Sequence, residues 1–272
     1  MTTNIIVTVG VGGMGQAITR RVGSGARIVL ADHDPDLLAH THEAMADDGY
    51  DVTPMAVDVS SAESVRNLAR AAADLGPVRH LVHTAGVSAA KSDTSSILAV
   101  DLLGVALSVE EFGEVIAPGG SGVVIASMAG TLAAPSVSSE MEQALRVTPP
   151  DELLSLPFLD SDALPSAPYA YAIAKRANQL RTAAAAVRWG ARGARINSIS
   201  PGIISTRQGR DELAGESGSS MRGMLDASPR RRLGTPGDIA AAAAFLLGPD
   251  ADFITGTDLL VDGGVVAARM VE

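Results

Sequence analysis

Short runs of β-branched residues alternate along the chain with longer segments rich in alanine and leucine. The short runs are almost continuously apolar, which is typical of parallel strands buried on both faces of a sheet. We predict strands over residues 4–9, 27–31, 52–57, 78–83, 122–126, 194–199 and 257–261, and helices over 13–23, 35–48, 61–75, 94–116, 168–190 and 236–247. This alternation predicts a single-domain α/β fold, a Rossmann-like doubly wound parallel sheet of about seven strands with helices on both faces.

Two segments interrupt the alternation. Residues 132–167 contain five prolines and several acidic side chains, and residues 207–228 are rich in glycine, serine, arginine and methionine. Segments beyond about 12–15 residues that lack the core pattern are often functional loops. We therefore interpret 132–167 as an insertion and 207–228 as a substrate lid, within one dinucleotide-binding catalytic domain over residues 1–272.

The composition argues against several classes of protein. A net charge of −10 disfavours binding to nucleic acid or to an anionic membrane surface. No apolar run approaches the roughly 18 residues of a membrane span. The lack of cysteine excludes disulfides and thiolate catalysis and fits a cytoplasmic protein. Met1–Asn4 lacks the basic region of a signal peptide, and the apolar run Ile5–Val9 is too short for its core.

A glycine-rich loop follows the first predicted strand and contains Gly10, Gly12, Gly13, Met14 and Gly15. Between a strand and a helix, this spacing lets a pyrophosphate approach the backbone amides at the helix N-terminus. We predict that the loop binds a dinucleotide, whereas the alternative is an ordinary glycine-rich turn.

The second predicted strand ends at Asp32, 22 residues after Gly10. A carboxylate there accepts hydrogen bonds from the adenosine ribose of NAD and repels the 2′-phosphate of NADP. No arginine or lysine lies in the glycine loop or directly after Asp32 to offset this repulsion, so we predict NAD as the cofactor. The alternative is that Asp32, with Asp34 and Pro35, only starts the next helix.

Two further strand ends supply candidate cofactor contacts. Asp58 and Val59 follow the third predicted strand, where a carboxylate can accept from the adenine amino group. A solvated cap for the helix that begins near Ser61 is the alternative role for Asp58. Ala85 and Gly86 follow the fourth strand, and their small size allows the backbone to lie close to a ligand.

Tyr171 and Lys175 are four residues apart and therefore share one face of a predicted helix. A phenol exchanges protons poorly at neutral pH, and a nearby ammonium lowers its pKa. We predict Tyr171 as a general acid/base beside a carbonyl or carbinol. Ser127 ends the fifth predicted strand, where its hydroxyl can hydrogen-bond the substrate oxygen.

Jointly, these motifs resemble those of the short-chain dehydrogenase/reductase family, over nearly the whole chain. The resemblance extends to Arg195-Ile196-Asn197, to Pro201-Gly202 with Thr206, and to Gly256 followed by Val261-Asp262-Gly263-Gly264. It implies that Tyr171 is the acid/base, that Lys175 holds the nicotinamide ribose and that Ser127 orients the substrate oxygen. It also implies contacts to the nicotinamide end from Pro201, Gly202, Ile204 and Thr206.

The chain departs from the family pattern at three places. The first glycine of the loop is displaced to Gly10, and His83-Thr84 stands where the family usually has two asparagines. Asp101 stands where an asparagine often helps to hold a water for proton relay. An ionised aspartate can accept a hydrogen bond from water but cannot donate one. We therefore expect the central Tyr171–Lys175 pair to be retained and the relay to be altered.

Ser127 and Tyr171 are 44 residues apart, a much longer separation than the family usually has. A similar insertion occurs in the subgroup that resembles 3α-hydroxysteroid dehydrogenase/carbonyl reductase. We expect residues 132–167 to lie beside the pocket and beside the helix predicted over 168–190, which family members often use for subunit contact. A homodimer or homotetramer is therefore expected, with the insertion favouring the dimer.

The predicted reaction is hydride transfer between NAD(H) and a secondary alcohol or ketone, a small-molecule substrate. Met221, Met224 and Leu225 of the predicted lid suggest a hydrophobic, steroid- or terpenoid-like compound. The alternatives are an NADP-dependent carbonyl reductase and a catalytically silent nucleotide-binding regulator. The five histidines show no recognisable metal-ligand spacing, so no metal site is predicted.

Overall fold

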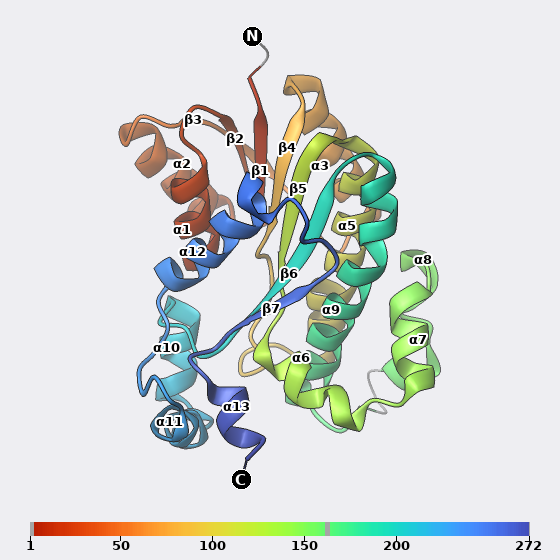
Figure 1. The fold of residues 1–272 in the computed structure, drawn as a ribbon, viewed down its shortest axis with the longest axis vertical. Helices are drawn as coiled ribbons and strands as arrows, with labels where there is room; N and C mark the ends of the chain where they lie inside the picture. The colour runs from red at the N-terminus through yellow and green to blue at the C-terminus, as the bar shows by residue number, and fades with distance from the viewer. Residues whose placement is uncertain (1–2, 161–163, 272) are drawn as a thin grey trace.

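The computed structural model describes residues 3–160 and 164–271 and places seven parallel strands in one sheet (Figure 1). The strands are β1 (Ile5–Val9), β2 (Arg27–Asp32), β3 (Asp51–Ala56), β4 (Val78–His83), β5 (Ile116–Ile125), β6 (Arg195–Pro201) and β7 (Asp258–Val261). Their order across the sheet is β3-β2-β1-β4-β5-β6-β7. The predicted doubly wound parallel sheet is confirmed.

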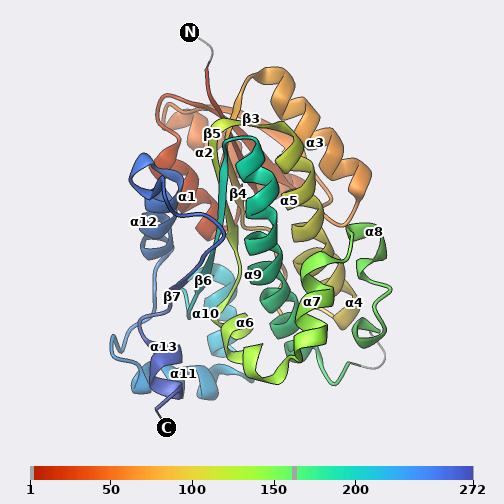
Figure 2. The same ribbon diagram turned by 45° about the vertical axis from the view of Figure 1, so that its right-hand side comes forward.

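Helices cover both faces of the sheet (Figures 1 and 2). One face carries α1 (Gly13–Val22), α2 (Pro35–Asp47) and α12 (Pro236–Leu247), and the other carries α3 (Ala62–Leu75), α5 (Gly104–Val115) and α9 (Ala167–Ala191). Aliphatic side chains fill both layers. Ile18, Val82 and Ile239 pack on the first face, and Val7, Leu81 and Phe112 pack on the second.

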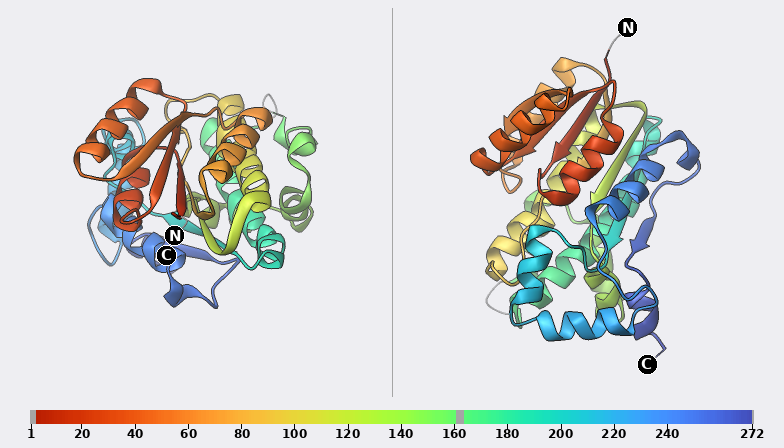
Figure 3. Two further views of the ribbon diagram at one scale, coloured as in Figure 1. Left: turned by 90° about the horizontal axis from the view of Figure 1, so that it is seen from above. Right: turned by 90° about the vertical axis from the view of Figure 1, so that its left-hand side faces the viewer.

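The strand order reverses between β1 and β4, each of which starts one half of the sheet. In doubly wound sheets, ligands bind beyond the carboxyl ends of the strands at this reversal. Several short elements gather at that edge, at the lower end in Figure 1 and in the right-hand view of Figure 3. They are α6 (Met128–Ala133), α10 (Arg207–Ala214), α11 (Gly218–Ala227) and α13 (Val265–Arg269).

The helix predicted over residues 94–116 is confirmed over Thr94–Val115, but it is not a regular α-helix throughout. The structure has a short α4 (Thr94–Ile97), a π-helical segment η1 (Leu98–Leu103) and then α5. A π-helical turn spaces side chains differently from an α-helix, and the aliphatic pattern of these residues does not reveal it. Strand β5 also begins at Ile116, six residues before the predicted start at 122, because Val78 of β4 pairs with Ile116.

Residues 132–167 and 207–228 are largely helical rather than loops. The first segment contains η2 (Ala134–Ser136), α7 (Ser139–Val147), α8 (Pro150–Leu153) and η3 (Pro157–Leu159), while its residues 161–163 lie outside the described part of the chain. Helix α7 lies along α9 (Figure 2). Glu142 forms an ion pair with Arg176 at 2.6 Å, and Arg181 donates to the carbonyls of Leu145 and Thr148 at 3.0 and 2.8 Å. The long α9 is thus attached to the sheet on one side and to this segment on another.

None of the helices in the described ranges is long and apolar enough to cross a membrane. The longest, α9, carries charged residues along its length, including Lys175, Arg176, Arg181 and Arg188.

Near the C-terminal end of α9, the buried Trp189 side chain packs against α5 and β5.

Trp189 supports the first prediction. Its side chain is fully buried, and its indole N–H donates to the Val109 carbonyl at 3.1 Å. Gly113 and Gly122 leave space for it, since a Cβ at either position would lie within 3.0 Å of the indole ring. Replacing Trp189 with alanine should lower the free energy of unfolding by about 3–5 kcal/mol.

Denaturant titration at fixed protein concentration measures this loss. Val187→Ala is the matched control, because Val187 lies on the same turn of α9 and is 81% exposed. The control should change stability by less than about 0.5 kcal/mol. Equal effects of the two substitutions would contradict the assigned packing of Trp189.

Candidate active site

The glycine loop joins β1 to α1 with very close backbone contacts. Gly10 has φ +91°, and a Cβ there would lie 2.4 Å from the amide nitrogen of Ala85. A Cβ at Gly15 would lie 2.1 Å from the carbonyl oxygen of Gly10. Gly12 is different, because a Cβ there would meet nothing within 4 Å. Packing therefore requires glycine at positions 10 and 15, while Gly12 leaves open space in front of the first turn of α1.

Thr84 holds this loop against the end of β4. Its hydroxyl donates to the Gly10 carbonyl at 2.6 Å, and its amide donates to the Val9 carbonyl at 2.7 Å. The sequence singled out position 84 only as a departure from the usual asparagine. The Thr84 hydroxyl is a donor, and it links the two strand ends in this chain.

Asp32 lies beside the glycine loop at the end of β2. One carboxylate oxygen accepts from the Val11 amide at 2.8 Å, and the other accepts from the Asp34 amide at 3.1 Å. These bonds show that Asp32 shapes the loop and the start of α2, which was the alternative role. Each carboxylate oxygen has a second lone pair, so the ribose role stays a prediction.

Asp58 and Val59 follow β3 and have different surroundings. The exposed Asp58 accepts from the amide and hydroxyl of Ser60 at 2.9 and 2.6 Å, while the adjacent Ser61 caps α3. Val59 is buried, and a Cβ at Gly104 would lie 2.8 Å from its side chain. The structure thus places Asp58 in a local turn, and its contact to adenine remains a prediction.

The segment after β6 lies against the end of β7 and the glycine loop. Gly202 lies against Asp262, where a Cβ would be 2.6 Å from the Asp262 Cα atom. Thr206 caps α10 through the Gly209 amide at 3.0 Å, and its methyl group would lie 3.4 Å from a Cβ at Gly13. Of the predicted nicotinamide contacts, Thr206 therefore lies close to the glycine loop, Gly202 lies against Asp262, and Pro201 and Ile204 are buried.

Met14 is the predicted cofactor contact of the glycine loop that is not a glycine. Met14 is partly buried and packs with the aliphatic core between α1 and α12. After β4, the Ala85 amide donates to the Val9 carbonyl at 2.9 Å. A Cβ at Gly86 would lie 2.6 Å from an Asp101 carboxylate oxygen and 3.3 Å from the Lys175 ammonium nitrogen.

Ser127 is positioned by a close contact between α6 and α9. It caps α6 by accepting from the Ala129 amide at 3.1 Å. At Gly130, a Cβ would lie 2.6 Å from the Arg176 nitrogen and from the Lys175 carbonyl carbon, so only glycine allows this approach. The contact brings Ser127 within hydrogen-bonding reach of Tyr171. Sequence reasoning missed Gly130, and its only signal is its place three residues after Ser127.

Tyr171 and Lys175 lie on the same face of α9, with the ammonium 5.3 Å from the centre of the phenol ring. Burial raises the pKa of Tyr171 above its ordinary value; Lys175 and the hydrogen bond with Ser127 oppose this rise, whereas Asp101 and Glu212 add to it. The sequence led us to expect a lowered pKa. Lys175 does act in that direction, but burial and the two carboxylates outweigh it.

Lys175 is itself held by Asp101 of η1. The ammonium lies 2.7 Å from one carboxylate oxygen, and the other oxygen accepts from the Val87 amide at 3.2 Å. Both side chains are buried. Burial lowers the pKa of Lys175, but Asp101 and Tyr171 more than offset this effect and leave that pKa above its ordinary value.

Helix α10 is attached to the segment after β4 by two polar contacts. The Ser88 hydroxyl donates to the Glu212 carboxylate at 2.5 Å, and the Lys91 ammonium lies 2.6 Å from the Asp211 carboxylate. Glu212 is close enough to contribute to the pKa of Tyr171. One turn of the 207–228 segment therefore lies near Tyr171.

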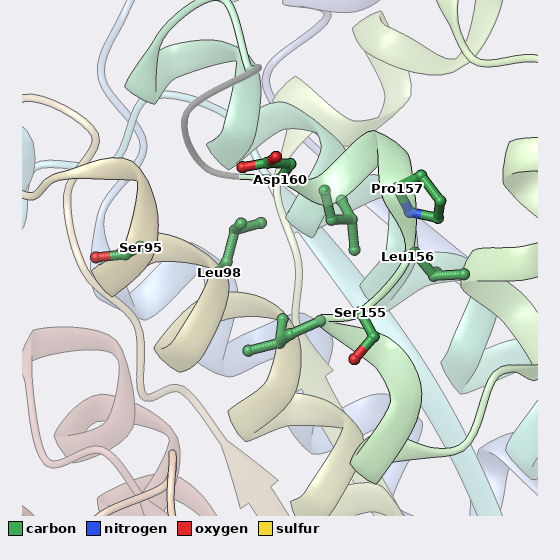
Figure 4. Close-up of a pocket in the computed structure, with 8 residues that line it drawn as sticks. Ser95, Leu98, Ser155, Leu156, Pro157 and Asp160 are labelled. Carbon is green, nitrogen blue, oxygen red and sulfur yellow. The ribbon is translucent and has the colours of Figure 1, made fainter.

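A cavity of about 500 Å³ lies at a separate place, between α4 and residues 154–160 (Figure 4). Leu98, Leu156 and Pro157 are among the side chains around it. None of the three catalytic candidates lines it. Leu98 and Leu156, which line the cavity, belong to the same hydrophobic cluster against which Tyr171 packs.

No group of three or more metal-ligating side chains occurs within residues 3–160 and 164–271. Two histidines of β4, the buried His83 and the partly buried His80, carry lowered pKa values. Burial and then the charge of Arg79 lower the pKa of His80 to about 4, and burial and then Lys175 lower that of His83 to about 3. Both imidazoles are neutral at physiological pH.

Comparisons with known proteins agree with this geometry. A family model described as short chain dehydrogenase matches residues 3–139, and one described as enoyl-(acyl carrier protein) reductase matches residues 154–266. The short-chain dehydrogenase/reductase bsc3 of Alternaria brassicicola is 41% identical over 267 residues, which cover 98% of this chain and 97% of the relative. Galactitol 2-dehydrogenase (L-tagatose-forming) of Cereibacter sphaeroides is 30% identical over 268 residues, covering 93% and 90% respectively.

Among solved structures, the 3-alpha-hydroxysteroid dehydrogenase of Pseudomonas sp. B-0831, complexed with NADH, has a TM-score of 0.80. It is 25% identical, and the match covers 99% of each chain. The chain belongs to the short-chain dehydrogenase/reductase family, and its fold fits the subgroup that the sequence suggested. It is therefore an oxidoreductase of a family that binds a nicotinamide cofactor and acts on alcohols and ketones.

Proposed function

We propose that this protein transfers a hydride between NAD(H) and a secondary alcohol or ketone. The observation that carries this proposal is the meeting of Ser127, Tyr171 and Lys175 beside the strand reversal. Ser127 comes from the end of β5 and the other two from α9, so residues 44 positions apart converge on one place. A hydroxyl, a phenol and an ammonium in this arrangement fit proton exchange with a carbinol or carbonyl oxygen.

The carboxyl edge of the sheet offers open space and backbone donors for a dinucleotide. Gly12 leaves open space before α1, whose first-turn amides have no intrahelical acceptors and favour an anion. Gly10, Gly12, Gly13 and Gly15 would hold the pyrophosphate, and Asp32 and Asp58 would hold the adenosine half. Ala85, Gly86, Lys175 and the segment from Pro201 to Thr206 would hold the nicotinamide half.

When bound, the nicotinamide supplies or accepts the hydride. The chain's own residues handle the proton. In reduction, the Tyr171 hydroxyl donates its proton to the substrate oxygen, and in oxidation the phenolate accepts it. The Ser127 hydroxyl donates a hydrogen bond to the same oxygen and stabilises the negative charge that develops there. The Lys175 ammonium orients the cofactor ribose and stabilises the phenolate.

We infer a hydrophobic substrate, steroid- or terpenoid-like in character. Met221, Met224 and Leu225 of α11 are partly buried in the 207–228 segment, which we propose is the substrate lid. The structural similarity to a hydroxysteroid dehydrogenase supports this class. The similarity to galactitol 2-dehydrogenase points instead to a polyol, and Glu212 would suit such a substrate.

The first test replaces the proposed acid/base. Tyr171→Phe removes the proton donor and should lower kcat by about 10²–10⁴-fold on the best alcohol of a panel of hydrophobic secondary alcohols. Tyr169→Phe is the matched control on the same helix and should retain activity. NADH binding, measured by fluorescence, should be the same in both variants. An active Tyr171→Phe protein would contradict the assignment, and NADH binding by an inactive wild type would favour a nucleotide-binding regulator.

The second test concerns the choice between NAD and NADP. Wild type should bind NADH more tightly than NADPH, because the Asp32 carboxylate repels the 2′-phosphate. Asp32→Asn keeps an acceptor for the Val11 amide and should reduce that preference by about tenfold, which corresponds to about 1.4 kcal/mol. Asp36→Asn changes the net charge equally at an exposed position of α2 and should leave the preference unchanged. Tighter binding of NADPH by wild type would support the NADP-dependent alternative.

The third test concerns the oligomer. Neither family model spans residues 140–153, which supports the proposal that α7 and α8 are an insertion. Because α7 packs on α9, we propose that it restricts one subunit interface and leaves a homodimer. Sedimentation at several concentrations should therefore detect a dimer. A tetramer that persists on dilution would contradict the proposal.

A further inference from the structure

Asp101 differs from the other residues of the site, because it is a buried carboxylate in direct contact with the lysine. It lies in the π-helical segment η1, which separates α4 from α5. Its two oxygens are used by the Lys175 ammonium at 2.7 Å and by the Val87 amide at 3.2 Å. Gly86 permits the pair, because a Cβ there would lie 2.6 Å from the Asp101 oxygen and 3.3 Å from the ammonium nitrogen.

We propose that Asp101 is a positioning residue that offsets the charge of Lys175 and keeps the Tyr171 phenol protonated to higher pH than a neutral residue at this position would. The proposal rests on the function proposed above. A lone ammonium next to a phenol stabilises the phenolate. When a carboxylate lies 2.7 Å from the ammonium, the net effect of the pair on the phenol is much weaker. The reason is that Lys175 lowers the pKa of Tyr171 and Asp101 raises it.

The other groups around Tyr171 add no positive charge that would favour the phenolate. Glu212 of α10 adds a second negative charge on the lid side, and it acts in the same direction as Asp101. Ser127 contributes a hydrogen bond that favours the phenolate but carries no charge. His83 of β4 faces Lys175 and is neutral, because burial and then Lys175 lower its pKa to about 3. Lys175 is thus the cation that favours the phenolate, and Asp101 is its direct partner.

The consequence differs for the two directions of the reaction. Reduction of a ketone uses the protonated phenol, so its rate should stay constant until the pH becomes alkaline. Oxidation of an alcohol uses the phenolate, so its rate should rise with pH and reach its plateau only in alkaline solution. Replacing the carboxylate with a neutral amide lowers the pKa of Tyr171, so both transitions should move to lower pH.

The experiment uses Asp101→Asn, which has nearly the same shape and no charge. The readout is the ultraviolet absorbance of tyrosinate as the pH is raised, in the protein without cofactor. The chain has three tyrosines, and subtracting the titration of Tyr171→Phe isolates the signal of Tyr171. We expect the Tyr171 midpoint in Asp101→Asn to fall by about one pH unit relative to wild type, the usual size of a single-charge effect.

Two further variants sharpen the result. Asp101→Glu retains the charge and should keep the alkaline midpoint. Glu110→Gln removes one negative charge from the exposed side of α5, where Glu110 lies 3.8 Å from Arg188, and should leave the midpoint unchanged. If Asp101→Asn does not fold, Asp101→Ser removes the same charge, leaves room for water beside Lys175 and carries the same expectation.

An unchanged or higher midpoint in the neutral variants would overturn the proposal. The pH profile of kcat/KM for alcohol oxidation should move with the absorbance midpoint, which a loss of stability alone would not produce. A wild type that oxidises no alcohol would count against the proposed function, whereas the absorbance titration would still decide the role of Asp101.

Discussion

Backbone contacts that leave no room for a side chain organise the site of this protein. Gly10 lies against Ala85 where the sheet reverses, and Gly130 lies against the backbone at Lys175. The first contact joins the ends of β1 and β4, and the second joins α6, which follows β5, to α9. Each requires a missing Cβ, because the nearest backbone atoms would lie within 2.6 Å of one. Residues far apart in the sequence thereby meet at the carboxyl edge of the sheet, where doubly wound folds bind their ligands.

Electrostatics at this edge depend on burial. In water, the charges of Asp101, Glu212 and Lys175 would be screened and would affect a phenol little. Within the protein, each contributes to the pKa of Tyr171, and so does a hydrogen bond with Ser127. The two carboxylates oppose the lysine, so the phenol keeps its proton more firmly than the Tyr171–Lys175 spacing alone would suggest. The same low-dielectric environment keeps His83 neutral beside the ammonium.

The features that were predictable from sequence are those that depend on local pattern. Apolar strand runs predicted the sheet, and the glycine spacing predicted the loop at Gly10, because backbone geometry limits which residues can stand there. The contact between Asp101 and Lys175 depends on the π-helical turn of η1, for which the aliphatic residues around it carry no sequence signal. The helices inside 132–167 were also missed, since prolines at α8 and η3 lie in their first turns and look like loop residues in the sequence.

Different faces of helix α9 contact different parts of the protein. One face presents Tyr171 and Lys175 to the cleft, and another receives α7 through the ion pair of Arg176 with Glu142. Between them, the Gln179 amide donates to the hydroxyls of Thr131 and Ser200 at 2.9 Å and ties the helix to α6 and β6. A displacement of α7 would therefore act on the helix that carries the acid/base, at the residue that follows Lys175. The 132–167 segment therefore contacts the same helix that carries the reactive pair.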